Sequence, residues 1–195
     1  MQISSPLTVA KPGGGCIKSV REAVYLGGLL TCDGRATREI ARRIGEAGRL
    51  FDSLVAVWKH AAITRKRKID IYESCMLSKL LYSLESLWIL QRDRWRLDAF
   101  HCRCLRRILR IPPSFVSRVS NQTVLEGGKS TALSGSLIER QKKLYSSIAQ
   151  LPEDSLVRLV VCDSSGMPVR WAGRRRQGRP RQQCAAEVFK LLEQA

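Results

Sequence analysis

Apolar side chains recur along most of the chain at helical spacing. Between residues 35 and 60 they follow one another at alternating intervals of four and three, which predicts an amphipathic helix. Residues 69 to 90 carry only four charges, so this segment is expected to form the central, most buried helix. A third helix is expected from Asp93, a plausible cap, to Leu109. Short links between the three predict a compact antiparallel bundle.

The third predicted helix divides its circumference between an apolar face and a basic face. At about 100° per residue, its apolar stripe falls within an arc about 100° wide. Arg103, Arg106 and Arg110 fall roughly opposite, and Pro112-Pro113 ends the helix. The stripe consists of Leu97, Phe100, His101, Cys104 and Ile108.

The segments on either side of the bundle are less regular. Gly27-Gly28 interrupts short apolar runs and favours a small hairpin. After Pro113 we expect short helices from Ser120, from Ser134 and after Pro152. The predicted fold class is therefore mainly α: a three-helix bundle preceded by a small β-hairpin, with short helices and a basic loop at the C-terminus. The expected units are a flexible lead-in (1–15), the hairpin (16–31), the bundle (32–111), accessory helices (112–162), a basic arm (163–182) and a short helix (183–195).

Positive charge is abundant and localised. The formal net charge is +17 with a pI near 10.2. Residues 35–68 carry +7, residues 92–110 carry +5 and residues 170–181 carry +6, so the rest of the chain is close to neutral. Such a distribution indicates a polyanionic partner, nucleic acid before membrane.

Two further basic groups are candidate nucleic-acid contacts. On the first predicted helix, Arg35, Arg38, Arg42 and Arg49 gather within an arc of about 60° on the side opposite the apolar stripe. The next helix, with Thr64 as its N-cap, begins with Arg65, Lys66, Arg67 and Lys68. The helix dipole disfavours cations there, so they indicate either an anionic partner or a solvated helix start.

The C-terminal basic arm has three interpretations. Gly178-Arg179-Pro180-Arg181 follows Arg174, Arg175 and Arg176 and resembles the core of an AT-hook, although Gln177 stands where that motif prefers Arg. A nonspecific phosphate-binding tail is the first interpretation, a nuclear import signal the second and minor-groove recognition the third.

The chain lacks the residue patterns of a self-contained active site. There is no adjacent Asp-Asp pair for paired metals, no GxxxxGK[ST] loop and no GxSxG turn. His101 and Cys104 share a helical face, but His60 is the other histidine and does not complete a four-ligand zinc site. We therefore expect no metal, no cofactor and no enzyme activity of the chain as it stands.

The cysteines and the hydropathy pattern bear on location. Seven cysteines, an odd number without a CxxC pair, indicate reduced thiols in a nuclear or cytoplasmic protein. No secretory signal pattern opens the sequence, and no run of about 18 apolar residues occurs. We expect neither secretion nor membrane spanning.

Three stretches together resemble the region that follows the polymerase core in LINE-like, non-LTR retrotransposon reverse transcriptases. They are YLGGLLTCDGRATREIARRIGEAGRLF, VWKHAAITRKRKIDIYESCMLSKLLYSLESLWIL and LDAFHCRCLRRILRI. The resemblance implies that Tyr25, Leu26 and Gly27 are similar to the primer-grip turn and that the helices are similar to the thumb. It also implies that the basic faces lie along phosphates of an RNA–DNA hybrid.

The chain also departs from that family. The fingers and the palm with its metal-binding aspartates should precede Tyr25, yet only twenty-four residues do. Pro112-Pro113-Ser114 stands where the family usually has an aromatic residue and Asp. The leading hypothesis is therefore a truncated, RNA-directed DNA polymerase fragment that binds duplex DNA or hybrid without catalysis, with a separately supplied palm as a second candidate partner. The alternatives are a nuclear, chromatin-associated protein using the GRPR arm, or a retroelement remnant without function.

Overall fold

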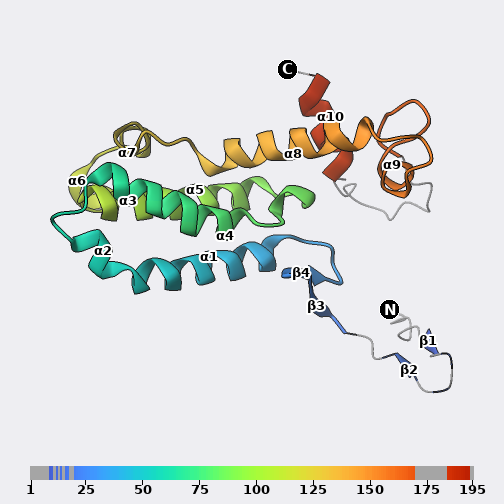
Figure 1. Ribbon diagram of the computed structural model, residues 1–195, viewed down its shortest axis with the longest axis horizontal. Coiled ribbons are helices and arrows are strands. Elements are labelled where there is room, and N and C mark those ends of the chain that lie inside the picture. The colour runs from blue at the N-terminus through green and yellow to red at the C-terminus, as the bar shows by residue number, and fades with distance from the viewer. Residues whose placement is uncertain are drawn as a thin grey trace.

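Helices make up most of the chain, as the apolar spacing predicts (Figure 1). The computed structural model describes residues 9–10, 12, 14, 16–17, 20–169 and 184–193. The bundle contains α1 (Thr37–Ser53), α2 (Val55–Lys59), α3 (Arg65–Tyr72), the π-helical turn η1 (Glu73–Leu77), α4 (Ser78–Leu81), the 3₁₀ turn η2 (Leu84–Ser86) and α5 (Gln91–Leu109).

The first predicted helix is interrupted once. The chain leaves helical geometry at Leu54, between α1 and α2. The interruption turns Trp58 back onto the end of α1, where its indole N–H donates to the Phe51 carbonyl at 2.8 Å. The two rings stack with centroids 4.9 Å apart. Residues 35–60 are thus mainly helical, with a sharp bend that the apolar spacing does not reveal.

The second predicted helix is correct at its start and wrong at its end. Thr64 caps it, because its hydroxyl accepts the Arg67 backbone N–H. The helical run ends at Leu81 instead of continuing to Leu90, since Ser83 adopts a left-handed conformation with φ 64°. Neither glycine nor proline marks this break. It directs Leu84 and Ile89 into the core, where both are buried.

The third predicted helix, α5, is the central one, contrary to the expectation for residues 69–90. It packs against α1, α3, α7 (Asn121–Gly128) and α8 (Leu133–Ala149). It also begins at Gln91, so Asp93 is not its cap. Asp93 is buried in the first turn and accepts hydrogen bonds from the Thr37 hydroxyl and from Arg96.

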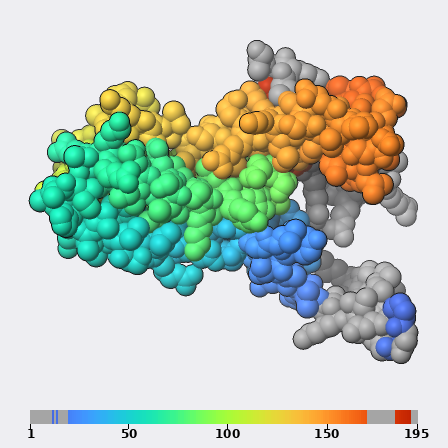
Figure 2. All heavy atoms as spheres, in the orientation of Figure 1, coloured from blue at the N-terminus to red at the C-terminus, as the bar shows by residue number. Residues whose placement is uncertain are grey.

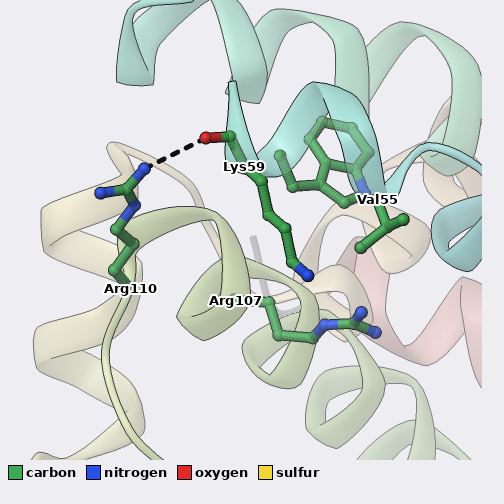
Figure 3. A pocket seen from close by; sticks show the side chains of 5 residues that line it. Val55, Lys59, Arg107 and Arg110 are labelled. Atoms are coloured by element: carbon green, nitrogen blue, oxygen red, sulfur yellow. Dashed lines mark hydrogen bonds between the residues drawn. The ribbon is translucent and has the colours of Figure 1, made fainter. Parts of the chain in front are cut away.

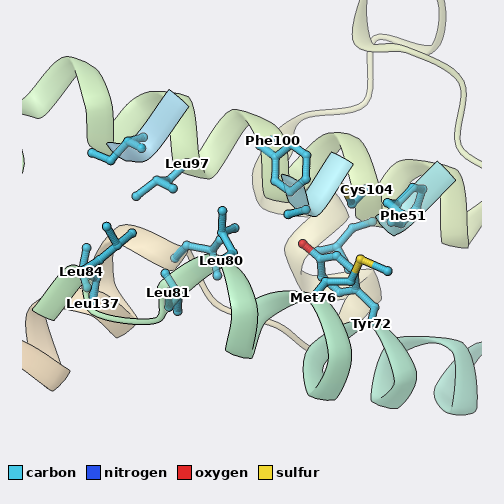
Figure 4. Packing of buried hydrophobic residues seen from close by; sticks show 14 of the residues in the cluster. Phe51, Tyr72, Met76, Leu80, Leu81, Leu84, Leu97, Phe100, Cys104 and Leu137 are labelled. Atoms are coloured by element: carbon cyan, nitrogen blue, oxygen red, sulfur yellow. The ribbon is translucent and has the colours of Figure 1, made fainter. Parts of the chain in front are cut away.

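Side-chain contacts fix the directions of the bundle helices. Thr37 meets Asp93 at the start of α1 and α5, and Asp52 meets Arg107 near their ends, so these two helices are parallel. The α3–α4 run is antiparallel to both, because Arg43 reaches the Lys79 carbonyl near its end. Figure 4 shows the shared core. It includes Phe51, Tyr72, Met76, Leu80, Leu97, Phe100 and Cys104.

The predicted hairpin forms over a shorter range than 16–31. Strands β3 (Glu22–Tyr25) and β4 (Gly28–Thr31) pair antiparallel around Leu26 and Gly27, both with positive φ, as a tight two-residue hairpin turn requires. It lies at one end of the bundle beside the start of α1 (Figures 1 and 2). Strand β1 (Val9–Ala10), in the predicted lead-in, pairs with β2 (Cys16–Ile17), at the start of the predicted hairpin range.

The region after α5 is helical, as predicted. It contains α6 (Ser114–Ser117), α7, α8, α9 (Leu156–Val161) and α10 (Cys184–Glu193). The Ser120 hydroxyl caps α7 by accepting the Thr123 N–H. Ser134 does not cap α8, which begins at Leu133, and its backbone N–H donates to Asp98 of α5. Helix α8 therefore lies across α5 and also contacts η2 and α10.

A chain of three polar side chains, centred on His101 of α5, crosses the core. The Tyr72 hydroxyl lies 2.8 Å from Nδ1 of His101, whose Nε2 lies 3.0 Å from the Ser130 hydroxyl. His101 is fully buried, and burial lowers its pKa to about 4. The neutral imidazole is therefore the form that the fold accommodates.

Acid should destabilise the protein through His101. An unfolded histidine titrates near pH 6.5, so between about pH 6.5 and 4 the unfolded chain binds more protons, and the free energy of unfolding falls as pH drops. We expect the wild type to lose roughly 2–3 kcal/mol more than His101→Gln over this range. Urea unfolding at several pH values measures the difference. The exposed His60 supplies the control, because His60→Gln should keep the wild-type profile; equal profiles for His101→Gln and wild type would contradict the assignment.

Candidate nucleic-acid interface

Four arginines of α5 and Arg110, the residue that ends the helix, form one exposed stripe. At about 100° per residue they fall within an arc of about 60°. All five side chains are exposed, whereas ten other residues of the helix are buried. At a rise of about 1.5 Å per residue the stripe is roughly 27 Å long. We call it the arginine stripe; its members are Arg92, Arg96, Arg103, Arg107 and Arg110.

The stripe retains much of its positive charge. Asp93 pairs with Arg96 at 3.0 Å and lies 3.8 Å from Arg92, while Asp52 pairs with Arg107 at 2.6 Å. Within the described parts of the chain, Arg103 and Arg110 form no ion pair. Five cations against two carboxylates leave a net charge of +3 on one helix face.

Small residues of α1 border this stripe. Thr37, Ala41, Gly45, Gly48 and Asp52 fall within about 80° of one another on α1. Arg92 donates to the Thr37 hydroxyl and Arg107 to Asp52, so this strip of α1 lies directly beside the arginines. A Cβ added at Gly45 would meet nothing within 4 Å. Because these side chains of α1 are small, the surface beside the guanidinium groups leaves room for a bulky ligand.

A basic hollow closes the C-terminal end of the stripe. It measures about 230 Å³ and is lined by Val55, Trp58, Lys59, Arg107 and Arg110 (Figure 3). The Arg110 guanidinium donates to the Lys59 carbonyl at 3.3 Å, and Arg107 lies over the Phe51 ring at 4.8 Å. Trp58, which is buried and stacked on Phe51, forms an apolar wall.

Arg106, predicted as a duplex contact, is buried and serves the fold instead. It is only 7% exposed and its guanidinium donates to the Val119 carbonyl at 2.7 Å and to Asn121 at 3.1 Å. It also reaches the Pro112 carbonyl. The prediction failed because α7 and the segment before it cover this side of α5. Arg107 takes the exposed place between Arg103 and Arg110.

Lys68, also predicted as a nucleic-acid contact, is buried. Its ammonium group donates to the carbonyls of Trp58 and His60, each at 2.8 Å. These carbonyls are left free where α2 ends, so a cation inside the fold fills a capping role. Arg65, Lys66 and Arg67 remain exposed, as expected for contacts.

The predicted stripe on the first helix is split between two roles. Arg35, Arg38 and Arg49 are exposed, with Arg38 paired to Glu22 at 2.6 Å and Arg35 lying 4.0 Å from Asp33. Arg42 is instead engaged by Glu39, Glu46 and the Gly27 carbonyl. Its charge is thus committed to the protein's own structure.

The turn Tyr25–Gly27 is exposed at its tip and anchored at its base. The Gly27 carbonyl accepts from Arg42 and Arg43, and the Leu26 carbonyl accepts from the Tyr82 hydroxyl. Burial raises the pKa of the Glu39 carboxyl, but hydrogen bonds from Arg42, Arg43 and Leu29 outweigh it and lower the pKa. Tyr25 and Leu26 are 66% and 76% exposed on this fixed base.

The remaining predicted contacts lie outside the described residues. These are Arg174, Arg175, Arg176, Arg179 and Arg181 of the basic arm. Among residues that the structure describes, no three His, Cys, Asp or Glu side chains gather as a metal would require. Within the same residues, no helix has the length and apolar character needed to cross a membrane. The cysteines with described side chains are free thiols.

Comparison with known proteins adds no relative. No family model, curated protein or solved structure matches the chain.

Four cations of the arginine stripe and of the basic hollow were missed by the sequence interpretation: Lys59, Arg92, Arg96 and Arg107. Three of them are arginines of α5, and a signal for these was present. Starting from Arg92, the stripe recurs at intervals of four, seven, four and three residues, which keeps it on one helix face. Counting from the apolar face alone placed Arg106 in the set and left Arg107 out.

Substitution of two arginines of α5, one buried and one exposed, should distinguish a structural role from an interface role. Arg106→Gln leaves buried acceptors unpaired and should lower the free energy of unfolding by about 2–4 kcal/mol. Arg103→Gln, at an exposed position of the same helix, should change it by less than about 0.5 kcal/mol. Urea unfolding monitored by circular dichroism measures both. Equal losses would show that Arg106 has no special structural role.

Proposed function

We propose that the chain is a thumb-like fragment of a non-LTR retrotransposon reverse transcriptase that binds an RNA–DNA hybrid or duplex DNA and has no catalytic centre of its own. The observation that carries the proposal is the confinement of five exposed arginines to one face of a rigid, buried helix. The motif order of the sequence supplies the family, and the arginine stripe supplies the binding surface.

The stripe suits the phosphate backbone of a duplex. Its length of roughly 27 Å is that of several successive phosphates, and its fork-shaped guanidinium groups match phosphate oxygens. Arginines spaced along a helix contact phosphates without recognising bases, which suits a protein that must slide along its template. The small residues of α1 leave room for the backbone to approach.

The hairpin tip is a second proposed contact. Tyr25 and Leu26 present an aromatic and an aliphatic side chain at a fixed distance from α1. A tip of this kind can contact the sugar or base at a strand end while the stripe holds phosphates.

Hybrid binding should be strongly salt dependent. If about five phosphates are neutralised, the slope of log K against log salt concentration is about −4. Fluorescence anisotropy with a labelled RNA–DNA hybrid at several salt concentrations measures it. The double variant Arg96→Gln/Arg103→Gln should flatten the slope by about 2. Arg140→Gln, an exposed arginine of α8, is the control and should leave the slope unchanged. Absence of detectable binding at low salt would refute the proposal.

The basic arm carries a competing function, because residues 170–181 concentrate a charge of +6. A chromatin-associated protein using this arm would lose DNA binding when the arm is deleted. The proposed thumb-like function predicts that this deletion weakens hybrid binding less than Arg96→Gln/Arg103→Gln does. The same anisotropy assay ranks the two variants, and the reverse ranking would favour the chromatin-associated alternative.

A further inference from the structure

The hollow at the end of the arginine stripe concentrates more positive charge than the fold needs. Lys59, Arg107 and Arg110 surround it, and Asp52, paired with Arg107, is the carboxylate that the structure places against any of them. The Lys59 ammonium has no hydrogen-bond or ion-pair partner among the described residues and points toward Arg107 (Figure 3). Like charges that line one hollow repel each other, and an anion bound between them would offset this repulsion.

Contacts with the protein hold two of the three cations in position. The Arg110 guanidinium donates to the Lys59 carbonyl, which ties the end of α2 to the end of α5. Arg110 itself has a left-handed backbone, φ 60°, which ends α5 and turns the side chain toward α2. Arg107 is held by Asp52 and by the Phe51 ring. Two of the three cations, Arg107 and Arg110, are thus held in place before any ligand arrives.

We infer that this hollow binds a terminal phosphate of a nucleic-acid strand. The inference deepens the proposed function and rests on it. Three cations against one carboxylate leave a charge of +2, which complements the dianion of a phosphate monoester better than the single charge of an internal phosphodiester. The volume of about 230 Å³ admits a phosphate with part of its sugar, and the walls formed by Val55 and Trp58 suit the apolar face of a sugar.

The site also fits its location. It lies where the arginine stripe ends, so a strand whose internal phosphates follow the stripe brings its terminus to Lys59. A free end then adds a charge-assisted contact that a continuous strand does not make. Strand ends would therefore fix the register of a duplex that the rest of the stripe holds loosely.

The test compares one RNA–DNA hybrid with a hydroxyl or a phosphate at its strand ends. We expect the 5′- or the 3′-phosphorylated hybrid to bind about five- to tenfold more tightly than the hydroxyl form. Lys59→Met should remove this preference and Lys59→Arg should keep it. Lys143→Met, which removes an exposed lysine of α8, is the matched control and should also keep it.

The outcomes separate the two proposals. Arg96→Gln/Arg103→Gln should weaken both hybrids equally and retain the preference for phosphate. Equal affinity for phosphate and hydroxyl ends would overturn the terminal-phosphate site and leave the thumb-like function standing. Binding of neither hybrid would overturn the proposed function and this inference with it. A phosphoserine peptide that competes as well as the phosphorylated hybrid would overturn the nucleic-acid assignment of the hollow.

Discussion

The burial of α5 on most of its circumference is the constraint on which the rest of the structure depends. Helices α1, α3, α7 and α8 cover it, so an arginine of α5 has two main solutions: it emerges through the uncovered strip or it finds hydrogen-bond acceptors inside. Arg106 takes the second solution and the arginine stripe takes the first. A single packing arrangement thus decides which cations stabilise the fold and which remain available to a ligand.

The difference between local and tertiary interactions accounts for what the sequence could and could not predict. Periodicity located the helices, the Thr64 cap and the basic character of α5, because these depend on neighbours within a few residues. It missed the break at Ser83 and placed Lys68 on the surface, because both depend on tertiary contacts. Lys68 is buried by the carbonyls at the end of α2, which only the bend at Leu54 brings close. The family resemblance and the binding function stay predictions.

Charge alone would have given a misleading picture of the candidate interface. Lys68, Arg42, Arg43 and Arg106 contribute to the high pI, yet each is engaged with carbonyls or carboxylates of the protein itself. Other cations keep exposed side chains, and those of the arginine stripe follow the seam between α1 and α5. An exposed cation keeps its charge available to an anionic ligand, whereas a cation already bonded to the protein would have to give up those bonds first.

The anchoring of the hairpin turn has a consequence for sequence change. The Leu26 carbonyl, the Gly27 carbonyl and the Leu29 N–H hold the turn to the bundle, and all three belong to the main chain. Replacement of the side chains at positions 25 and 26 leaves these atoms in place. The side chains at the tip can therefore diversify under selection, while these main-chain hydrogen bonds keep the tip in the same position.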